Sequence, residues 1–118
     1  MKARLGAAVM NVAVEPQGSV LQGGVAGPHK VEGIGASVVP VTFDRSVCDR
    51  IMMVQDYSAF GMVKRLAMEE GILAGSSAGA VVCAAVHLAI ELGAGKRVVV
   101  VIPDSAERYL SKGLLGQV

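Results

Sequence analysis

Short apolar runs alternate along the chain with longer segments in which apolar and polar positions are mixed. Four runs, at residues 9–14, 50–55, 72–74 and 98–102, are too short for helices and predict strands. The last of them is unbroken and β-branched, which is typical of an interior parallel strand buried on both faces. Residues 38–43 are also apolar but contain a proline, so we expect at best a short edge strand or an extended connection there.

Helices are predicted between these runs. An apolar face repeats at helical spacing over residues 57–70, for which Asp56 is a good N-cap. A second helix extends through residue 92 to a glycine C-cap, and a short third helix starts near Glu107. Strands that alternate with helices in this way predict an α/β fold: a three-layer, mostly parallel open sheet with flanking helices.

Composition narrows the class of protein. The chain has 118 residues, a formal net charge of +1, 53% hydrophobic residues and 3% aromatic residues, so it offers no basic surface for nucleic acid. Cys48 and Cys83 lie far apart without the spacing of a metal or redox pair, which favours a reduced, cytoplasmic protein. Residues 1–14 have the outline of a signal peptide, but Asn11 interrupts the apolar stretch and no small-residue cleavage site follows.

A membrane helix is a further alternative for residues 71–90, which carry no charge and have glycines at four-residue spacing. Paired serines, a histidine and acidic residues at both ends argue against it.

The Gly-Ser-Ser-Ala-Gly turn at residues 75–79 joins a predicted strand to a predicted helix, where α/β folds bind ligands. Ser77 could act there as an N-cap. The turn also fits G-x-S-x-G, the nucleophile motif of α/β-hydrolases. That fold needs a histidine well after the serine, and the only later one, His87, lies ten residues on in the same helix and points away. We therefore place His87 on the helix surface or at an interface.

A long irregular segment, residues 17–35, is rich in glycine. A loop of this length inside a domain is either functional or disordered, and its length alone does not decide between the two.

Four stretches carry a resemblance to a known family: Val-Glu-Pro-Gln-Gly-Ser at 14–19, Gly-Pro-His-Lys-Val-Glu-Gly-Ile-Gly-Ala at 27–36, Glu-Gly-Ile-Leu-Ala-Gly-Ser-Ser-Ala-Gly-Ala at 70–80, and Ile-Pro-Asp-Ser-Ala-Glu-Arg-Tyr-Leu-Ser at 102–111. In this order and spacing they resemble the C-terminal part of the cysteine synthase and cystathionine β-synthase family, pyridoxal-phosphate enzymes of fold type II. The resemblance implies a single α/β segment over 1–118, corresponding to the C-terminal part of the catalytic core, with the N-terminal part that carries the cofactor lysine absent.

The resemblance also implies a cofactor site. The serine matching Ser77 hydrogen-bonds the pyridine nitrogen of pyridoxal phosphate, and the loop matching Gly33 and Gly35 lies against cofactor and substrate, where glycine permits close backbone approach. The turn matching Pro103 and Asp104 lies beside the pyridine ring. Simpler alternatives are a flexible turn for the two glycines and a helix cap for Asp104. No metal site and no catalytic residue is assigned.

The activity implied is replacement at the β-carbon of an activated serine by a sulfur nucleophile, as in cysteine biosynthesis and related amino-acid metabolism. The residues do not separate a cysteine synthase (a transferase) from a cystathionine β-synthase (a lyase). None of the lysines lies in the family's Schiff-base motif, and its substrate-carboxylate and phosphate loops have no match. We therefore expect a fragment that is inactive alone and either self-associates as an oligomer or needs a missing N-terminal polypeptide. The alternative is a non-catalytic interaction or regulatory module.

Overall fold

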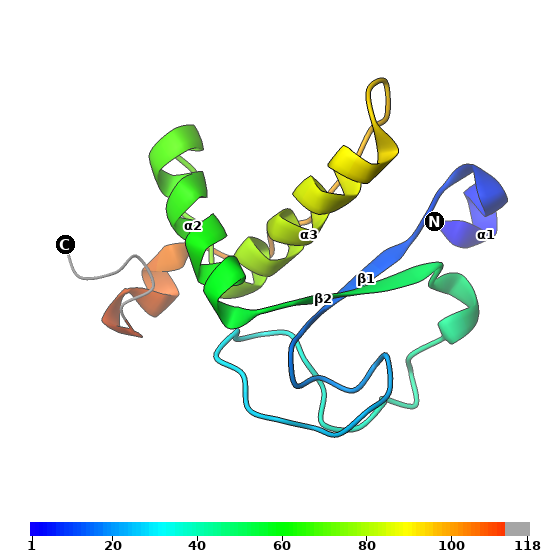
Figure 1. The fold of residues 1–118 in the computed structure, drawn as a ribbon, viewed down its shortest axis with the longest axis horizontal. Helices are drawn as coiled ribbons and strands as arrows, with labels where there is room; N and C mark the ends of the chain where they lie inside the picture. Colours follow the sequence, from blue (N-terminus) through cyan, green and yellow to red (C-terminus); the bar gives the residue numbers. More distant parts are fainter. Residues whose placement is uncertain (113–118) are drawn as a thin grey trace.

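The computed structural model describes residues 1–112, and Figure 1 shows the arrangement of their elements. Two parallel strands lie beside a pair of longer helices, and short helical turns flank them at both ends of the chain. In chain order the elements are α1 (Lys2–Leu5), η1 (Gly6–Ala8), β1 (Val12–Pro16), η2 (Arg45–Val47), β2 (Arg50–Val54), α2 (Asp56–Glu70), α3 (Ser76–Leu92) and η3 (Ala106–Lys112), where η denotes a 3-10 helix.

The sheet and its helices confirm the predicted α/β class. Strands β1 and β2 pair in parallel, with Val12 opposite Arg50 and Pro16 opposite Val54. Helix α3 contacts both strands, and α2 packs against α3. The result is an open parallel sheet with flanking helices.

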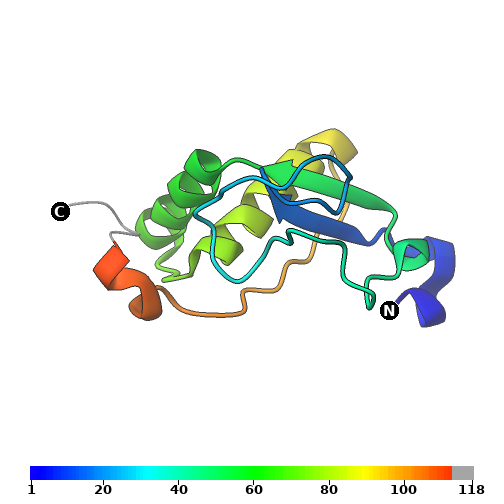
Figure 2. The same cartoon turned by 90° about the horizontal axis from the view of Figure 1, so that it is seen from below.

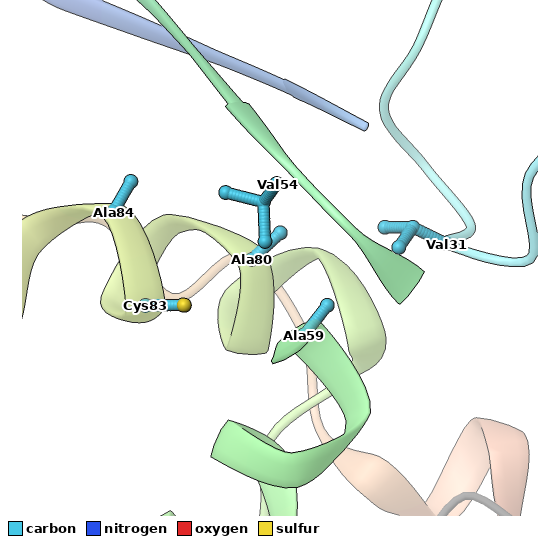
Figure 3. Packing of buried hydrophobic residues seen from close by; sticks show 6 residues of the cluster. All are labelled: Val31, Val54, Ala59, Ala80, Cys83 and Ala84. Atoms are coloured by element: carbon cyan, nitrogen blue, oxygen red, sulfur yellow. The ribbon is translucent and has the colours of Figure 1, made fainter. Parts of the chain in front are cut away.

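Small side chains form most of the core between the sheet and the two helices. The central cluster comprises Val31, Val54, Ala59, Ala80, Cys83 and Ala84 (Figure 3). Alanine and glycine let the helices approach closely: a Cβ placed on Gly79 of α3 would collide with the backbone oxygen of Ala59 in α2.

Both cysteines are free thiols, and burial raises the pKa of the Cys83 thiol.

Two of the predicted strands do not form in the part of the chain that the structure describes. Residues 98–102 are extended but unpaired, and Val99 and Val101 are 78% and 77% exposed. Residues 72–74 contribute a single antiparallel bridge between Ala74 and Ser105. The reason is that a strand needs a neighbour to hydrogen-bond with. Figures 1 and 2 show the segment after α3 running back along that helix, away from β1 and β2.

Smaller differences concern element boundaries. Strand β1 covers Val12–Pro16 rather than 9–14. Of the two possibilities for residues 38–43, an edge strand or a connection, the structure shows a connection without a strand. Asp56 is not the N-cap of α2: Gln55 caps the helix, and Asp56 begins it. Instead, the Asp56 carboxylate accepts a hydrogen bond from the amide of Lys30 at 2.8 Å, which ties the long irregular segment to α2.

No helix found within residues 1–112 combines the length and the apolar character needed to cross a bilayer.

Candidate cofactor site

The irregular segment after β1 follows a defined path because a buried carboxylate holds it. Glu15 is fully buried at the end of β1, and its two carboxylate oxygens accept hydrogen bonds from the amides of Leu21 at 2.8 Å and Gln22 at 3.1 Å. Further along, the amide of Gly27 donates to the carbonyl of Gly18 at 2.9 Å. Of the two alternatives for this segment, functional or disordered, these hydrogen bonds argue against the disordered one.

The same loop is closed on the Gly33–Gly35 turn. The hydroxyl of Ser19 accepts from the amide of Ala36 at 2.9 Å, and the amide of Val20 donates to the carbonyl of Ala36 at 3.1 Å. Gly35 has a φ of 97°, and a Cβ there would lie 2.5 Å from Nε2 of His29. This position therefore requires glycine both for its backbone angle and for its contact.

Two neighbouring serines at the start of α3 have different surroundings. Gly75 is the N-cap, so the N-cap alternative for Ser77 is wrong. The hydroxyl of Ser76 accepts a hydrogen bond from the amide of Glu32 at 3.0 Å. Ser77 is 4% exposed, and its hydroxyl forms no hydrogen bond with another residue in the described range. A nearly buried hydroxyl without a protein partner is available for a ligand.

The structure brings Gly33 next to this free hydroxyl. Gly33 has a φ of 84°, and a Cβ placed on it would lie 3.9 Å from the Oγ atom of Ser77. Forty-four residues of chain separate the two, and the bond from Glu32 to Ser76 fixes their approach. Two of the residues predicted to bind the cofactor therefore meet at the N-terminus of α3.

Asp104 approaches the same helix end at Gly75. Its Oδ2 atom accepts a hydrogen bond from the hydroxyl of Tyr109, and its Oδ1 atom is buried with no hydrogen-bond partner in residues 1–112. A Cβ placed on Gly75 would collide with this Oδ1 atom. The adjacent carboxylate raises the pKa of the Tyr109 hydroxyl, with smaller contributions from burial and from Glu32. Pro103, which precedes Asp104 in the chain, is exposed.

A cavity of about 330 Å³ adjoins these residues. It lies between the irregular segment, α2 and the start of α3, and neither Ser77 nor Gly33 lines it. Its lining residues are His29, Lys30, Val31, Glu32, Phe60, Ser76 and Tyr109. Sequence reasoning missed Ser76, His29 and Tyr109 as parts of this region, although all three lie in the stretches that carry the resemblance.

Other chemistries find less support in the geometry. His87 is exposed on α3, as predicted, and lies on the same helix as Ser77, so the two cannot form a catalytic pair. Among the described residues no group of three His, Cys, Asp or Glu side chains is arranged to hold a metal ion.

Comparison with known proteins identifies the class. Residues 1–104 match the family described as pyridoxal-phosphate dependent enzyme, and the chain belongs to that family. Among curated relatives, it is 51% identical over 104 residues to a cysteine synthase of Staphylococcus aureus, an alignment that covers 87% of this chain and 34% of the relative. It is 49% identical over 105 residues to an O-acetylserine dependent cystathionine beta-synthase of Bacillus subtilis, covering 89% and 34%. The chain thus spans about a third of the length of these relatives.

Solved structures agree with the sequence relatives. The O-acetylserine dependent cystathionine beta-synthase of Helicobacter pylori superposes with a TM-score of 0.89 at 42% identity, over 96% of this chain and 37% of that one. The cysteine synthase of Entamoeba histolytica gives a TM-score of 0.88 at 33% identity, over 96% and 34%. The predicted resemblance and the fold type II class are confirmed.

The donor chemistry at the start of α3 fits pyridoxal phosphate. An unpartnered serine hydroxyl suits the pyridine nitrogen, and glycine at position 33 leaves that hydroxyl without a side chain above it. The shape fits less closely, because the Gly33–Gly35 turn lies over Ser77 and leaves it only 4% exposed. Gly33 and Gly35 both have positive φ angles, and because glycine has no Cβ, the backbone of this turn can change conformation without a steric clash of its own side chains.

Proposed function

We propose that this chain supplies the cofactor-contacting C-terminal part of the catalytic core of a pyridoxal-phosphate-dependent enzyme that replaces a group at the β-carbon of an activated serine with a sulfur nucleophile. One observation supports this most strongly: the free, nearly buried hydroxyl of Ser77 at the start of α3, faced by Gly33. The names of the relatives point to the same substrates, since they include cysteine synthases and O-acetylserine dependent cystathionine beta-synthases.

Each residue of the site has a proposed task. Pyridoxal phosphate supplies a ring that stabilises negative charge at the α-carbon of the amino-acid substrate. Ser77 hydrogen-bonds the ring nitrogen through its hydroxyl, which holds the ring in place without keeping that nitrogen protonated as a carboxylate would. Gly33 and Gly35 let the backbone close on the ring, and the Pro103–Asp104 turn borders it.

The chain needs a partner to act. None of its lysines lies in a motif of the type that bonds the cofactor, so we propose that the reactive lysine belongs to another polypeptide segment. Exposed apolar residues support this proposal: Val99 and Val101 are 78% and 77% exposed, and Ile90 on α3 is 75% exposed. We propose that the remaining part of the family fold, or a second copy of this chain, covers them in the cytoplasm, without nucleic acid or membrane.

The alternative of a non-catalytic interaction module has less support. The relatives and solved structures named above all carry enzyme names, and the residues around Ser77 leave a polar group ready for a ligand. Nothing at the site separates a cysteine synthase from a cystathionine β-synthase.

Complementation tests the enzymatic proposal. The chain would be co-expressed with the part of the Staphylococcus aureus cysteine synthase that it does not cover, and cysteine formation from O-acetylserine and sulfide measured. We expect cysteine formation only when both polypeptides are present, and tighter retention of pyridoxal phosphate in the complex than in the chain alone. Ser77→Ala should lower both, whereas Ser37→Ala, at an exposed loop position, should leave them unchanged. A complex that assembles but neither retains cofactor nor forms cysteine would refute the proposal.

A further inference from the structure

The segment after α3 returns to the turn that precedes this helix and is fastened to it. Ala74 and Ser105 form an antiparallel bridge, and the amide of Ala106 donates to the carbonyl of Leu73 at 3.3 Å. Ala106 is 1% exposed and packs with Val63 of α2. The start of η3 is therefore a fixed support beside the N-terminus of α3.

From this support, Tyr109 reaches back to Asp104. Its hydroxyl donates to Oδ2 of Asp104, and its ring lies so close to the N-cap of α3 that a Cβ on Gly75 would be 2.8 Å from Cε2. The other carboxylate oxygen, Oδ1, lies directly against Gly75. Glycine at the N-cap thus makes room for both partners of the Tyr109–Asp104 pair.

Physical chemistry indicates what the pair does. A negative charge near a helix N-terminus is favourable because the first amides and the helix dipole are electropositive there. A buried carboxylate oxygen without a donor is unfavourable, and Oδ1 of Asp104 is such an atom among residues 1–112. The charge-assisted bond from Tyr109 offsets part of that cost and leaves the carboxylate one orientation, facing Gly75.

We propose that Tyr109 is a positioning residue of the cofactor site: its hydroxyl holds the Asp104 carboxylate against Gly75 and so fixes the first turn of α3, which presents Ser77. This inference rests on the proposed function of Ser77. Tyr109 lies outside residues 1–104, the range matched by the family, so the family match assigns it no role.

The pair can be tested without any cofactor because the chain has two tyrosines and no tryptophan. In a Tyr57→Phe background, near-ultraviolet tyrosinate absorbance reports Tyr109 alone. Besides Asp104, Glu32 and Arg108 act on this hydroxyl, Glu32 raising and Arg108 lowering its pKa. We expect ionisation above the ordinary value near 10, shifted down by Asp104→Asn. An unchanged titration in Asp104→Asn would overturn the pair in solution.

The positioning role is tested by hydrogen exchange and cofactor binding. Relative to Tyr57→Phe, which alters an exposed ring of the same kind, Tyr109→Phe should speed amide exchange in peptides covering residues 74–80. It should also raise the dissociation constant for pyridoxal phosphate by about tenfold, the value of one hydrogen bond to a charged group. Asp104→Asn should have the same effect on both, since it weakens the same bond.

The outcomes separate the two proposals. If the parent chain binds pyridoxal phosphate and Tyr109→Phe binds it equally well, with unchanged exchange at 74–80, the positioning role is overturned while the function of Ser77 stands. If no variant binds pyridoxal phosphate saturably, the proposed function of the chain alone fails. The positioning role is then judged by exchange and titration: faster exchange with a shifted titration supports it, and their absence overturns it.

Discussion

The close crossing of α2 and α3 predicts that position 79 tolerates nothing larger than glycine. A Cβ placed on Gly79 would collide with the backbone oxygen of Ala59 and lie 2.6 Å from Cγ2 of Val63. Ala59 and Val63 are both fully buried. Because one of the colliding atoms is backbone, relief requires the two helices to move apart, which loosens the core that supports the start of α3.

Two contributions set the size of the effect of Gly79→Ala. Forcing an extra carbon into a packed core costs about 1–3 kcal/mol. Alanine in place of glycine inside a helix stabilises the folded chain by about 1 kcal/mol, because its helix propensity is higher. Gly61 of α2 provides a matched control, because a Cβ there meets no atom within 4 Å, so Gly61→Ala gains the helix term alone. The free energies of unfolding of the two variants should therefore differ by about 1–3 kcal/mol.

Urea unfolding followed by far-ultraviolet circular dichroism measures this difference at equal protein concentration, which also controls for self-association. Gly61→Ala should unfold at higher urea than the parent chain, and Gly79→Ala at lower urea or not cooperatively at all. If the two variants were equally stable, the helices would not cross as closely as the structure describes.

Two further substitutions follow from the hydrogen bonds. Glu15→Gln places an NH2 group against the amide of Leu21 or Gln22, which then loses its hydrogen-bond acceptor. The free energy of unfolding should fall by about 1–3 kcal/mol, and hydrogen exchange at both amides should become faster. Unchanged values would contradict these two hydrogen bonds. Arg50→Gln removes the partner that lowers the pKa of Glu91. A lowered acid pKa adds stability at neutral pH that is lost as pH falls through the folded-state value. The stabilities of the two proteins should therefore converge as pH falls below the ordinary glutamate value of 4.5, and a difference that stays constant would count against the ion pair.

Elements set by local pattern were predictable from sequence, and elements set by distant pairing were not. Helix α2 and the end of α3 lie close to their predicted positions because an apolar face and a glycine C-cap are local signals. The run at 98–102 has every local mark of a strand, yet it stays unpaired in the structure because no strand within residues 1–112 lies beside it. Pairing depends on a neighbour that the run itself does not encode.

The candidate site divides in a similar way. Ser77, Gly33 and Asp104 were identifiable from the stretches that carry the resemblance, and the structure places all three around the first turn of α3. The role of Tyr109 was not predictable, because its hydrogen bond joins a residue inside η3 to Asp104, which lies before this helix, and leaves no recurring spacing in the sequence. Only the structure could show that, within residues 1–112, the hydroxyl of Ser76 is hydrogen-bonded to the protein while that of Ser77 is not.

The most direct test of the central claim is equilibrium dialysis of the purified chain against pyridoxal phosphate, with Ser77→Ala and Ser76→Ala measured alongside. We expect saturable binding that Ser77→Ala weakens by about tenfold, the effect of losing one hydrogen bond, with little change in stability. Ser76→Ala should chiefly lower the free energy of unfolding, because the hydroxyl of Ser76 accepts a hydrogen bond from the amide of Glu32. Saturable binding that is the same in Ser77→Ala and the parent chain would contradict the claim that this hydroxyl holds the cofactor.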